Sequence, residues 1–296
     1  MMAMANMGVE VNFAPAAPAA NARPSAMRLL VPREHGSWGL WLLPLISGAV
    51  VGWSARSDSA VPAVLWFFLA ATSAFLVHQP FQAWLGHSAL RARSLEEKRT
   101  ALTATLILFA LSVLSLIVMT IEGRSLILLV VVVAAGCFCA NVLMAGTRLR
   151  SLRPIAQIVG ALGLTSTAVG AYYAVAGTLD VRAAVLWLAS WLFAAAQIAY
   201  VQLRLRTVSA RSPAERLRAG WKVYVLHLAL PMAAAIAAIV GQAHWLLALS
   251  FVPAAARLAL WAVSPPARLH VHRLGFTELI HSLLFAALLV VALLQS

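Results

Sequence analysis

Long apolar stretches separated by short polar turns run through most of the chain. Leu126–Ala140 and Leu283–Leu294 are two such stretches, and with their flanks they approach the roughly 20 residues that a helix needs to cross a bilayer. The short alternating segments typical of a transmembrane β-barrel are not seen. We therefore predict an all-α fold, a polytopic transmembrane helical bundle. Its nine expected spans are about Trp38–Ser54, Val61–Trp84, Ala101–Ile121, Ser125–Met144, Ile155–Ala176, Ala183–Leu203, Val223–Val240, His244–Val263 and Phe276–Leu294.

The first residues differ in composition from the rest of the chain. Residues 1–27 are rich in Ala, Asn, Pro and Met and contain neither a basic start nor a continuous apolar stretch. This composition does not fit a signal peptide, and we expect a disordered tail. Residues 28–296 are expected to form a single transmembrane helical domain, because no break in the pattern indicates a second one.

The basic residues are distributed unequally between alternate loops. The chain is 62% apolar and only 10% charged, with a formal net charge of +13, whereas soluble domains are about half apolar and about a quarter charged. Of the basic residues outside the spans, 18 fall on one side and 3 on the other. Because cytoplasmic loops retain Lys and Arg, we expect a multi-pass protein of the bacterial cytoplasmic (inner) membrane, with the N-terminus inside and the C-terminus outside.

Polar residues inside the spans gather in the half that is predicted to face the cytoplasm. Ionisable groups within a membrane are costly and often functional, so this set defines the candidate substrate-binding residues. Two further groups join it: the cluster before span one and the arginines of the adjoining loops. The candidates are Arg33, His35, Trp38, His78, Gln82, Asn141, Arg150, Gln157, Gln197, Tyr200, Arg204, His227 and Arg257.

We expect these residues to line a polar, hydrated pocket that is open to the cytoplasm. Snorkelling of long side chains to the interface is the alternative, and it explains Arg257 or Gln157 taken singly. It does not explain Asn141, Gln197 or His227, whose side chains are short.

Catalytic residues are not identified by any motif, but four candidates follow from their position. Glu278 and His281 are three residues apart and share a helix face. They form either an acid/base couple or a local ion pair that makes burial tolerable. Glu34 and His35 form a similar cluster at the start of span one.

A short sequence echo follows spans two and six. Residues 92–98 and 210–216 each contain Ser-x-x-Glu, a capping box that starts a helix. The echo indicates either two independent helix caps or a duplicated four-helix unit. Five glycines in the spans are expected to allow close helix packing, as small residues do in membranes: Gly48, Gly52, Gly160, Gly163 and Gly170.

Three motifs resemble those of a known family. The run PREHGSW at 32–38, followed by Leu-Pro-Leu at 43–45, resembles the opening of the YwiC-like family of bacterial membrane proteins. Tyr200–Arg204 is similar to that family's exit from span six, and Leu274–Glu278 to its approach to the last span. The likeness extends from about residue 30 to the end, and it implies no established activity.

The nine-span layout also resembles the UbiA prenyltransferase architecture. In that superfamily, Asp-rich motifs after spans two and six hold magnesium and a prenyl diphosphate. Here the aspartates are Asp58 and Asp180, both predicted to lie on the outer side. Magnesium prefers carboxylate oxygens, so we expect no cofactor and no metal, and a shared layout is not a shared function.

Three functional hypotheses remain. The first is that the protein binds or modifies an anionic, lipid- or isoprenoid-like substrate. If it is an enzyme, which is uncertain, it would be a divergent prenyltransferase-like transferase without the Asp-rich motifs. The second is a proton-coupled small-molecule transporter, and the third is a non-catalytic subunit of a membrane complex. The expected partners are membrane lipid and a lipid- or isoprenoid-phosphate ligand. No nucleic acid is expected, and protein partners are unknown.

Overall fold

The described residues form an all-helical bundle. The computed structural model describes residues 35–56, 61–86, 92, 94–146, 152–207, 212–264 and 271–296. In chain order the helices are α2 (His35–Ser54), α3 (Val61–Leu85), α4 (Leu95–Ile121), α5 (Ile127–Gly146), α6 (Arg153–Thr165), α7 (Thr167–Ala176), α8 (Val181–Arg206), α9 (Pro213–Ile239), α10 (Leu246–Val263) and α11 (Val271–Leu294).

The helices match the predicted spans in number and order. Within the described ranges, 8 helical segments are long and apolar enough to cross a membrane, and Trp38–Ser54 is a shorter apolar helix. Pro154–Ala176, which comprises most of α6 and all of α7, counts as one segment. The prediction of an all-α transmembrane bundle with about nine spans is therefore confirmed. The expected tail at residues 1–27 lies outside the described residues.

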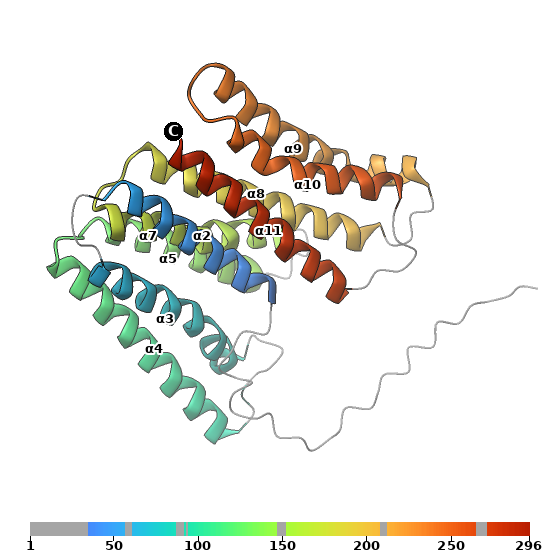
Figure 1. Cartoon of the computed structure of the whole chain (residues 1–296). Helices are drawn as coiled ribbons and strands as arrows, with labels where there is room; N and C mark the ends of the chain where they lie inside the picture. The colour runs from blue at the N-terminus through green and yellow to red at the C-terminus, as the bar shows by residue number, and fades with distance from the viewer. Residues whose placement is uncertain are drawn as a thin grey trace, which may run out of the picture.

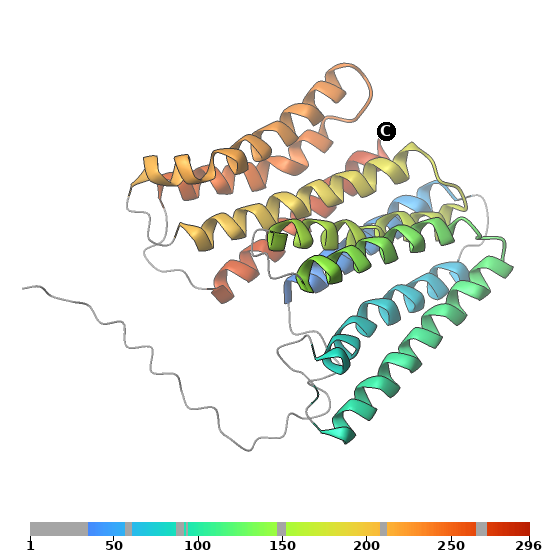
Figure 2. The same ribbon diagram turned by 180° about the vertical axis from the view of Figure 1, so that it is seen from behind.

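The helices lie side by side in an elongated array (Figures 1 and 2). The α3–α4 hairpin forms one flank and the α9–α10 hairpin the opposite flank, with α2, α7, α8 and α11 between them. The turn between α9 and α10 and the C-terminus lie at one end of the array, whereas the N-terminal ends of α4 and α9 lie at the other.

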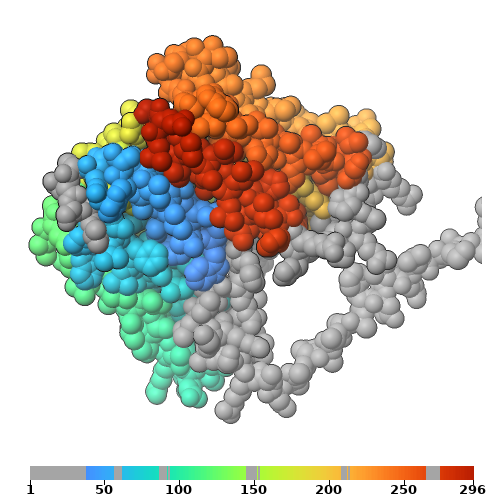
Figure 3. Space-filling view, viewed as in Figure 1, coloured from blue at the N-terminus to red at the C-terminus, as the bar shows by residue number. Residues whose placement is uncertain are grey.

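The flanking hairpins lie at opposite edges of the molecule in the space-filling view (Figure 3), and both expose apolar side chains. Leu106 and Phe109 on α4 are more than half exposed, as are Leu228 and Met232 on α9. A helix that is apolar on its exposed face is stable in lipid and not in water. The exposed faces of the flanks therefore support the membrane assignment.

Glycines let α2 and α7 pack closely at the centre of the bundle. A Cβ added to Gly48 would lie 2.1 Å from the carbonyl oxygen of Ala168, and one added to Gly52 would lie 2.8 Å from that of Tyr172. The two helix backbones thus approach more closely than any larger residue permits. The prediction that these glycines serve packing is confirmed.

The fifth span is broken at Ser166, between α6 and α7. The hydroxyl of Ser166 donates to the carbonyl of Gly163 at 2.7 Å, and that of Thr167 donates to the carbonyls of Leu164 at 2.8 Å and Trp41 at 3.0 Å. Hydroxyl groups can satisfy backbone carbonyls where a membrane helix is interrupted. The continuous span expected over 155–176 therefore contains a break.

The two Ser-x-x-Glu segments both start helices. Ser94 forms a complete capping box with Glu97 at the start of α4, and Ser212 accepts a hydrogen bond from the backbone N–H of Glu215 at the start of α9. The echo therefore marks two N-caps, and a duplicated four-helix unit stays a prediction.

Candidate functional site

Six of the predicted residues meet between four helices near one end of the bundle. Gln197, Tyr200 and Arg204 lie on α8, His227 on α9, Arg257 on α10 and Glu278 on α11. We call these six residues the Arg257 cluster. The contacts between them, described below, join segments that are far apart in the sequence.

Arg257 lies at the centre of this cluster. Its side chain is only 9% exposed and forms a salt bridge with Glu278. Its Nη1 also lies 3.5 Å from the side-chain oxygen of Gln197, and its guanidinium stacks 4.0 Å from the centroid of the Tyr200 ring. A carboxylate, an amide and an aromatic face therefore surround a cation that the membrane interior would otherwise disfavour.

Arg204 lies one turn from Tyr200 along α8. Its Nη1 donates to the hydroxyl of Tyr200 at 3.0 Å, and its guanidinium lies 5.6 Å from the ring centroid of Trp261. A guanidinium near an aromatic face gains a cation–π attraction. This contact places a second cation beside the ring on which Arg257 stacks.

His227 faces the same aromatic ring from α9. Its side chain is 2% exposed, and its ring meets that of Tyr200 edge-on at a centroid distance of 6.4 Å. Its Nδ1 lies 2.9 Å from the carbonyl oxygen of Val223. Because a carbonyl oxygen only accepts hydrogen bonds, Nδ1 carries the hydrogen and Nε2 carries the lone pair in the neutral ring.

Glu278 has a different partner from the one that its spacing predicts. The i, i+3 spacing pairs it with His281, but the structure pairs it with Arg257 of the neighbouring helix. His281 Nδ1 instead lies 2.7 Å from the carbonyl of Thr277 on its own helix. The guanidinium is a permanent cation with a fork that matches a carboxylate, so it is the stronger partner.

Several buried polar atoms at this place have no hydrogen-bond partner within the described part of the chain. They are donors or acceptors of side chains on α9, α10 and α11. Leaving such an atom unpaired costs about 1–3 kcal/mol of desolvation, so their concentration at one place indicates a site and not a tightly satisfied core. The atoms are Tyr224 Oη, His227 Nε2, Arg257 Nε, Arg257 Nη2 and Glu278 Oε2.

Two functional candidates at this site were not predicted from the sequence. Arg216, buried near the start of α9, donates from Nε and Nη2 to the carbonyl of Ala262 in the last turn of α10, at 3.2 and 3.0 Å. Tyr224 packs against the apolar cluster that contains Tyr200 and Trp261. In the sequence Arg216 resembles any other loop arginine, and Tyr224 lies at the edge of an apolar span, so neither had a distinguishing signal.

The other predicted residues lie at separate helix interfaces. On α3, Gln82 and His78 are hydrogen-bonded to each other at 2.9 Å, and the His78 ring contacts Phe138 of α5. Trp38 packs edge-on against Phe75 of α3. These contacts join α2 and α5 to α3, on the side of the bundle away from the α9–α10 hairpin.

Asn141 and Gln157 connect neighbouring helices. Asn141 Nδ2 donates to the backbone carbonyl of Ala156 at 2.6 Å, which joins α5 to α6. Gln157 is exposed and accepts a hydrogen bond from Gln202 of α8 at 3.0 Å. The first contact satisfies a polar group between helices, as polar side chains do in membranes.

Some predicted residues cannot be placed. Arg33, Glu34 and Arg150 lie outside the described residues, and of His35 only the backbone, at the first position of α2, is described. Among the side chains that the structure does describe, no group of three His, Cys, Asp or Glu residues is arranged to hold a metal ion.

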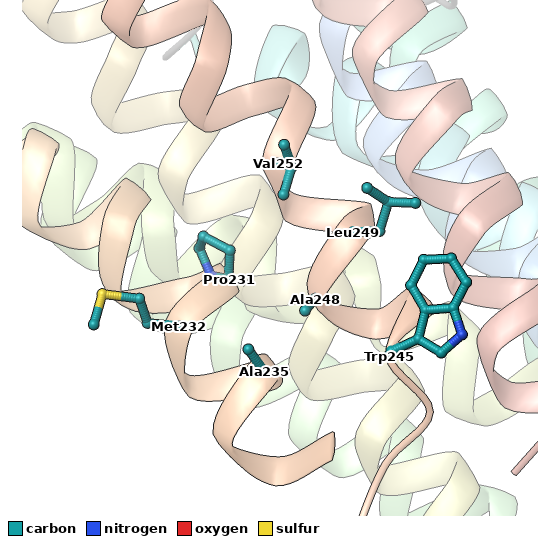
Figure 4. A pocket seen from close by; sticks show the side chains of 7 residues that line it. All are labelled: Pro231, Met232, Ala235, Trp245, Ala248, Leu249 and Val252. Atoms are coloured by element: carbon teal, nitrogen blue, oxygen red, sulfur yellow. The ribbon is translucent and has the colours of Figure 1, made fainter. Parts of the chain in front are cut away.

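A surface groove between α9 and α10 is lined by none of the residues of the Arg257 cluster (Figure 4). It has a volume of about 430 Å³ and lies between α9 and α10, where Pro231, Met232 and Ala235 face Trp245 and its neighbours on α10. Every lining residue is apolar or a tryptophan, and the exposed Met232 and Trp245 open it to the surroundings. Such a groove suits a hydrocarbon chain and has no group for a polar ligand.

The charge of the Arg257 cluster and its surroundings is positive. The cluster contains two guanidinium groups, those of Arg204 and Arg257, and one described carboxylate, that of Glu278, and Arg216 is a third guanidinium near the start of α9. Arginine binds phosphate and carboxylate groups directly through paired N–H donors. The arrangement is therefore able to bind an anion without a metal.

The comparison with known families covers the first half of the bundle. Residues 31–172 match a family described as YwiC-like protein. This segment contains the PREHGSW motif, whereas the motifs at 200–204 and 274–278, and the Arg257 cluster, lie beyond it. No curated protein matches the chain. The resemblance noted in the sequence is thus confirmed over residues 31–172, the segment in which the chain matches the YwiC-like family.

Proposed function

We propose that this protein binds an amphiphilic anion, a lipid- or isoprenoid-like phosphate, from the cytoplasmic leaflet of the bacterial inner membrane. The head group would bind at the Arg257 cluster, and the tail would lie against the apolar helix faces. The proposal includes the expected orientation, with the N-terminus inside, because the basic loops at the Arg257 end of the bundle favour it. It also includes a UbiA-like order of spans.

The observation that carries this proposal is the buried guanidinium of Arg257. Two of its donor nitrogens, Nε and Nη2, have no partner in the described chain, although the side chain has polar neighbours on two other helices, α8 and α11. Arg204 adds a second cation at the same ring. A phosphate group carries several acceptor oxygens and would satisfy both donors of Arg257 at once.

Glu278 sets the condition for binding. Its carboxylate occupies part of the Arg257 fork, and the unpaired atoms of the cluster are inaccessible in the structure. A head group on Nε and Nη2 of Arg257 would bring a second anion beside Glu278, which holds Nη1. We expect the two anions to compete for the guanidinium, so that binding would weaken the pairing of Glu278 and leave Arg257 paired.

The proposal concerns binding, and it assigns no metal. The chain has two aspartates, Asp58 and Asp180, and Asp180 caps α8 and accepts a hydrogen bond from Tyr172 at 2.6 Å. The segment after α8 contains Glu215, whose backbone takes part in the cap of α9. Within the described part of the chain, Asp180 and Glu215 lie at opposite ends of α8 and so do not share the carboxylate cluster that a magnesium–diphosphate complex requires.

Two arginines on one helix give a matched test of the proposal. Arg204 contacts Tyr200 within the cluster, whereas Arg206, two residues further on, is exposed in the last turn of α8. We expect Arg204→Gln to weaken binding of geranylgeranyl phosphate about tenfold, because hydrogen bonds to charged groups contribute about 1.5–3 kcal/mol. The affinity is measured by native mass spectrometry of the detergent-solubilised protein.

Arg206→Gln is the control, with the same loss of charge and little expected effect. Equal losses in both variants would show that only general surface charge attracts the probe. If the wild-type protein binds neither geranylgeranyl phosphate nor phosphatidic acid at micromolar concentration, the proposed function is wrong.

A proton-coupled transporter is the second candidate, and one observation favours it. Glu278, His227 and His281 are titratable groups within a membrane, and the first two lie in the Arg257 cluster. In this case Glu278→Gln would abolish pH-dependent uptake into proteoliposomes. If Glu278 acts only as an internal anion, the wild-type protein shows no pH-dependent uptake, and Glu278→Gln strengthens anion binding.

The third hypothesis, a non-catalytic subunit, predicts instead a stoichiometric protein partner on purification.

A further inference from the structure

His227 presents a hydrogen-bond acceptor at a site that otherwise favours anions. Its Nδ1 donates to the carbonyl of Val223 within α9, so the neutral ring directs a lone pair from Nε2. That atom is buried and has no partner in the described chain. A lone pair facing an anionic oxygen is repulsive unless a proton lies between them.

The unpaired atoms around His227 are of both kinds. Arg257 Nε and Nη2 are donors, His227 Nε2 is an acceptor, and the hydroxyl of Tyr224 is either. The charged groups of the cluster are Arg204 from α8, Arg257 from α10 and Glu278 from α11, and Arg216 lies nearer the start of α9 and binds the carbonyl of Ala262. A ligand that satisfies the whole set must accept several hydrogen bonds and also donate one.

We infer that the Arg257 cluster selects phosphate monoesters over phosphate diesters, with His227 as the residue that determines this specificity. The inference rests on the proposed function and names the head group that the site takes. Arg257 would bind two phosphate oxygens, and His227 Nε2 would share a proton with a third.

The chemistry of the two esters gives the physical reason. A phosphate monoester has a second ionisation near pH 6, so at neutral pH a proton is available at little cost to bridge an oxygen and Nε2. A diester carries one charge and no further proton, so none of its oxygens can donate a hydrogen bond to the lone pair of His227. It leaves Nε2 unpaired, and an unpaired buried acceptor weakens binding.

Two lipids that differ by a single methyl group on the phosphate test the inference. Dioleoyl phosphatidic acid is a monoester, and dioleoyl phosphatidylmethanol is its methyl diester with the same tails. We expect the wild-type protein to prefer the monoester by about tenfold, which corresponds to one hydrogen bond to a charged group. Native mass spectrometry with both lipids in one sample gives the ratio directly. A second pair, geranylgeranyl phosphate and its methyl ester, shows whether isoprenoid tails are taken as well as acyl tails.

Variants at His227 assign the preference. In H227Q the amide can donate as well as accept, so it can bind the oxygens of either ester, and the monoester preference should fall to about one while the diester binds. H227F retains the ring and has no polar atom, and it should also lose the preference; it serves if H227Q fails to fold, as judged by size-exclusion chromatography.

The outcomes separate this inference from the proposed function. Binding of both esters with equal affinity by the wild-type protein overturns the inference and leaves the proposed function standing. Binding of neither ester overturns both. A monoester preference that persists in H227Q and H227F shows that another residue reads the head group, and it overturns the role of His227.

Discussion

Arg257 shows how a single charged residue is accommodated in the apolar part of a bundle. From the sequence, snorkelling to the interface explains this residue taken alone, yet the side chain is buried and paired with Glu278. The reason lies in its position on α10. Arg257 belongs to the same buried stripe as Phe251, Ala254 and Leu258, so its side chain faces neighbouring helices and not the interface. An arginine at the centre of a membrane costs about 2.5–3.5 kcal/mol or more, and the carboxylate offsets this cost.

Substitutions of the two members of the Arg257–Glu278 ion pair are expected to change the affinity for an anionic ligand in opposite directions. We expect Glu278→Gln to strengthen binding of geranylgeranyl phosphate, because the amide carries no charge to compete for Arg257. We expect Arg257→Lys to weaken it about tenfold or more, because lysine has no paired donor fork. Both affinities are measured by native mass spectrometry in detergent.

Removal of Arg257 has a separate effect on stability. In Arg257→Ala the carboxylate of Glu278 is left buried without its partner, which typically costs about 3–5 kcal/mol, so the apparent melting temperature should fall. The double variant Arg257→Ala/Glu278→Gln should recover much of that loss. A double variant that melts as low as the single one would contradict the view that charge pairing, and not packing, stabilises this place.

At the scale of helices, glycines determine how the spans pack. The approach of α2 and α7 is closest at Gly48, which faces the backbone of Ala168. Helices in lipid gain no hydrophobic energy from association, so close van der Waals contact carries their packing. The four helices around Arg257 are positioned against this central pair, with α11 and α8 sharing the large apolar core with α2 and α7.

A pair of glycine substitutions tests the packing of α2 on α7. Gly48→Ala would place a Cβ 2.1 Å from a carbonyl oxygen, and overpacking of this kind costs about 1–3 kcal/mol. Gly136→Ala on α5 is the control, because a Cβ there meets nothing within 4 Å. The apparent melting temperature should fall for the first variant only. Equal melting of both variants would mean that α2 can move away from α7 freely.

At the scale of the whole molecule, the bundle has two unlike ends. The N-terminal ends of α4 and α9 lie at one end (Figure 1), together with Arg204 and Arg206 in the last turn of α8 and Arg216 near the start of α9. The turn between α9 and α10 lies at the other end, where Asp180 bonds to Tyr172. The Arg257 cluster lies toward the arginine-rich end, so the side from which a ligand arrives depends on how this end is oriented in the membrane.

Cysteine labelling tests the expected orientation. Arg218→Cys in the first turns of α9 should react with a membrane-impermeant maleimide only from the cytoplasmic side, and Gln242→Cys in the turn after α9 only from outside. Both variants are made after Cys137 and Cys139 are replaced by alanine. Labelling of Arg218→Cys in intact spheroplasts would place the Arg257 cluster near the outer leaflet, and the cytoplasmic source of the ligand would then be wrong.

Part of the candidate site was accessible from sequence and part was not. The depth of Gln197, Tyr200, His227 and Glu278 within their spans follows from counting residues along an apolar run, and the structure brings these side chains together. The same counting placed His78 and Gln82 at a similar depth, yet they lie at the α3–α5 interface. The depth of a residue gives its position along the membrane normal but not within the membrane plane. Residues at equal depth on different helices can therefore lie on opposite flanks.

Span positions, helical class and glycine packing sites follow from the residues in order, because the bilayer acts on each segment separately through its length, polarity and side-chain size. The partner of Glu278, the contact of Arg216 with the last turn of α10 and the break at Ser166 emerge only once the helices are assembled. Each of these depends on the rotation of one helix about its axis and on its neighbour in the array. Those quantities come from packing between distant segments, which no single segment encodes.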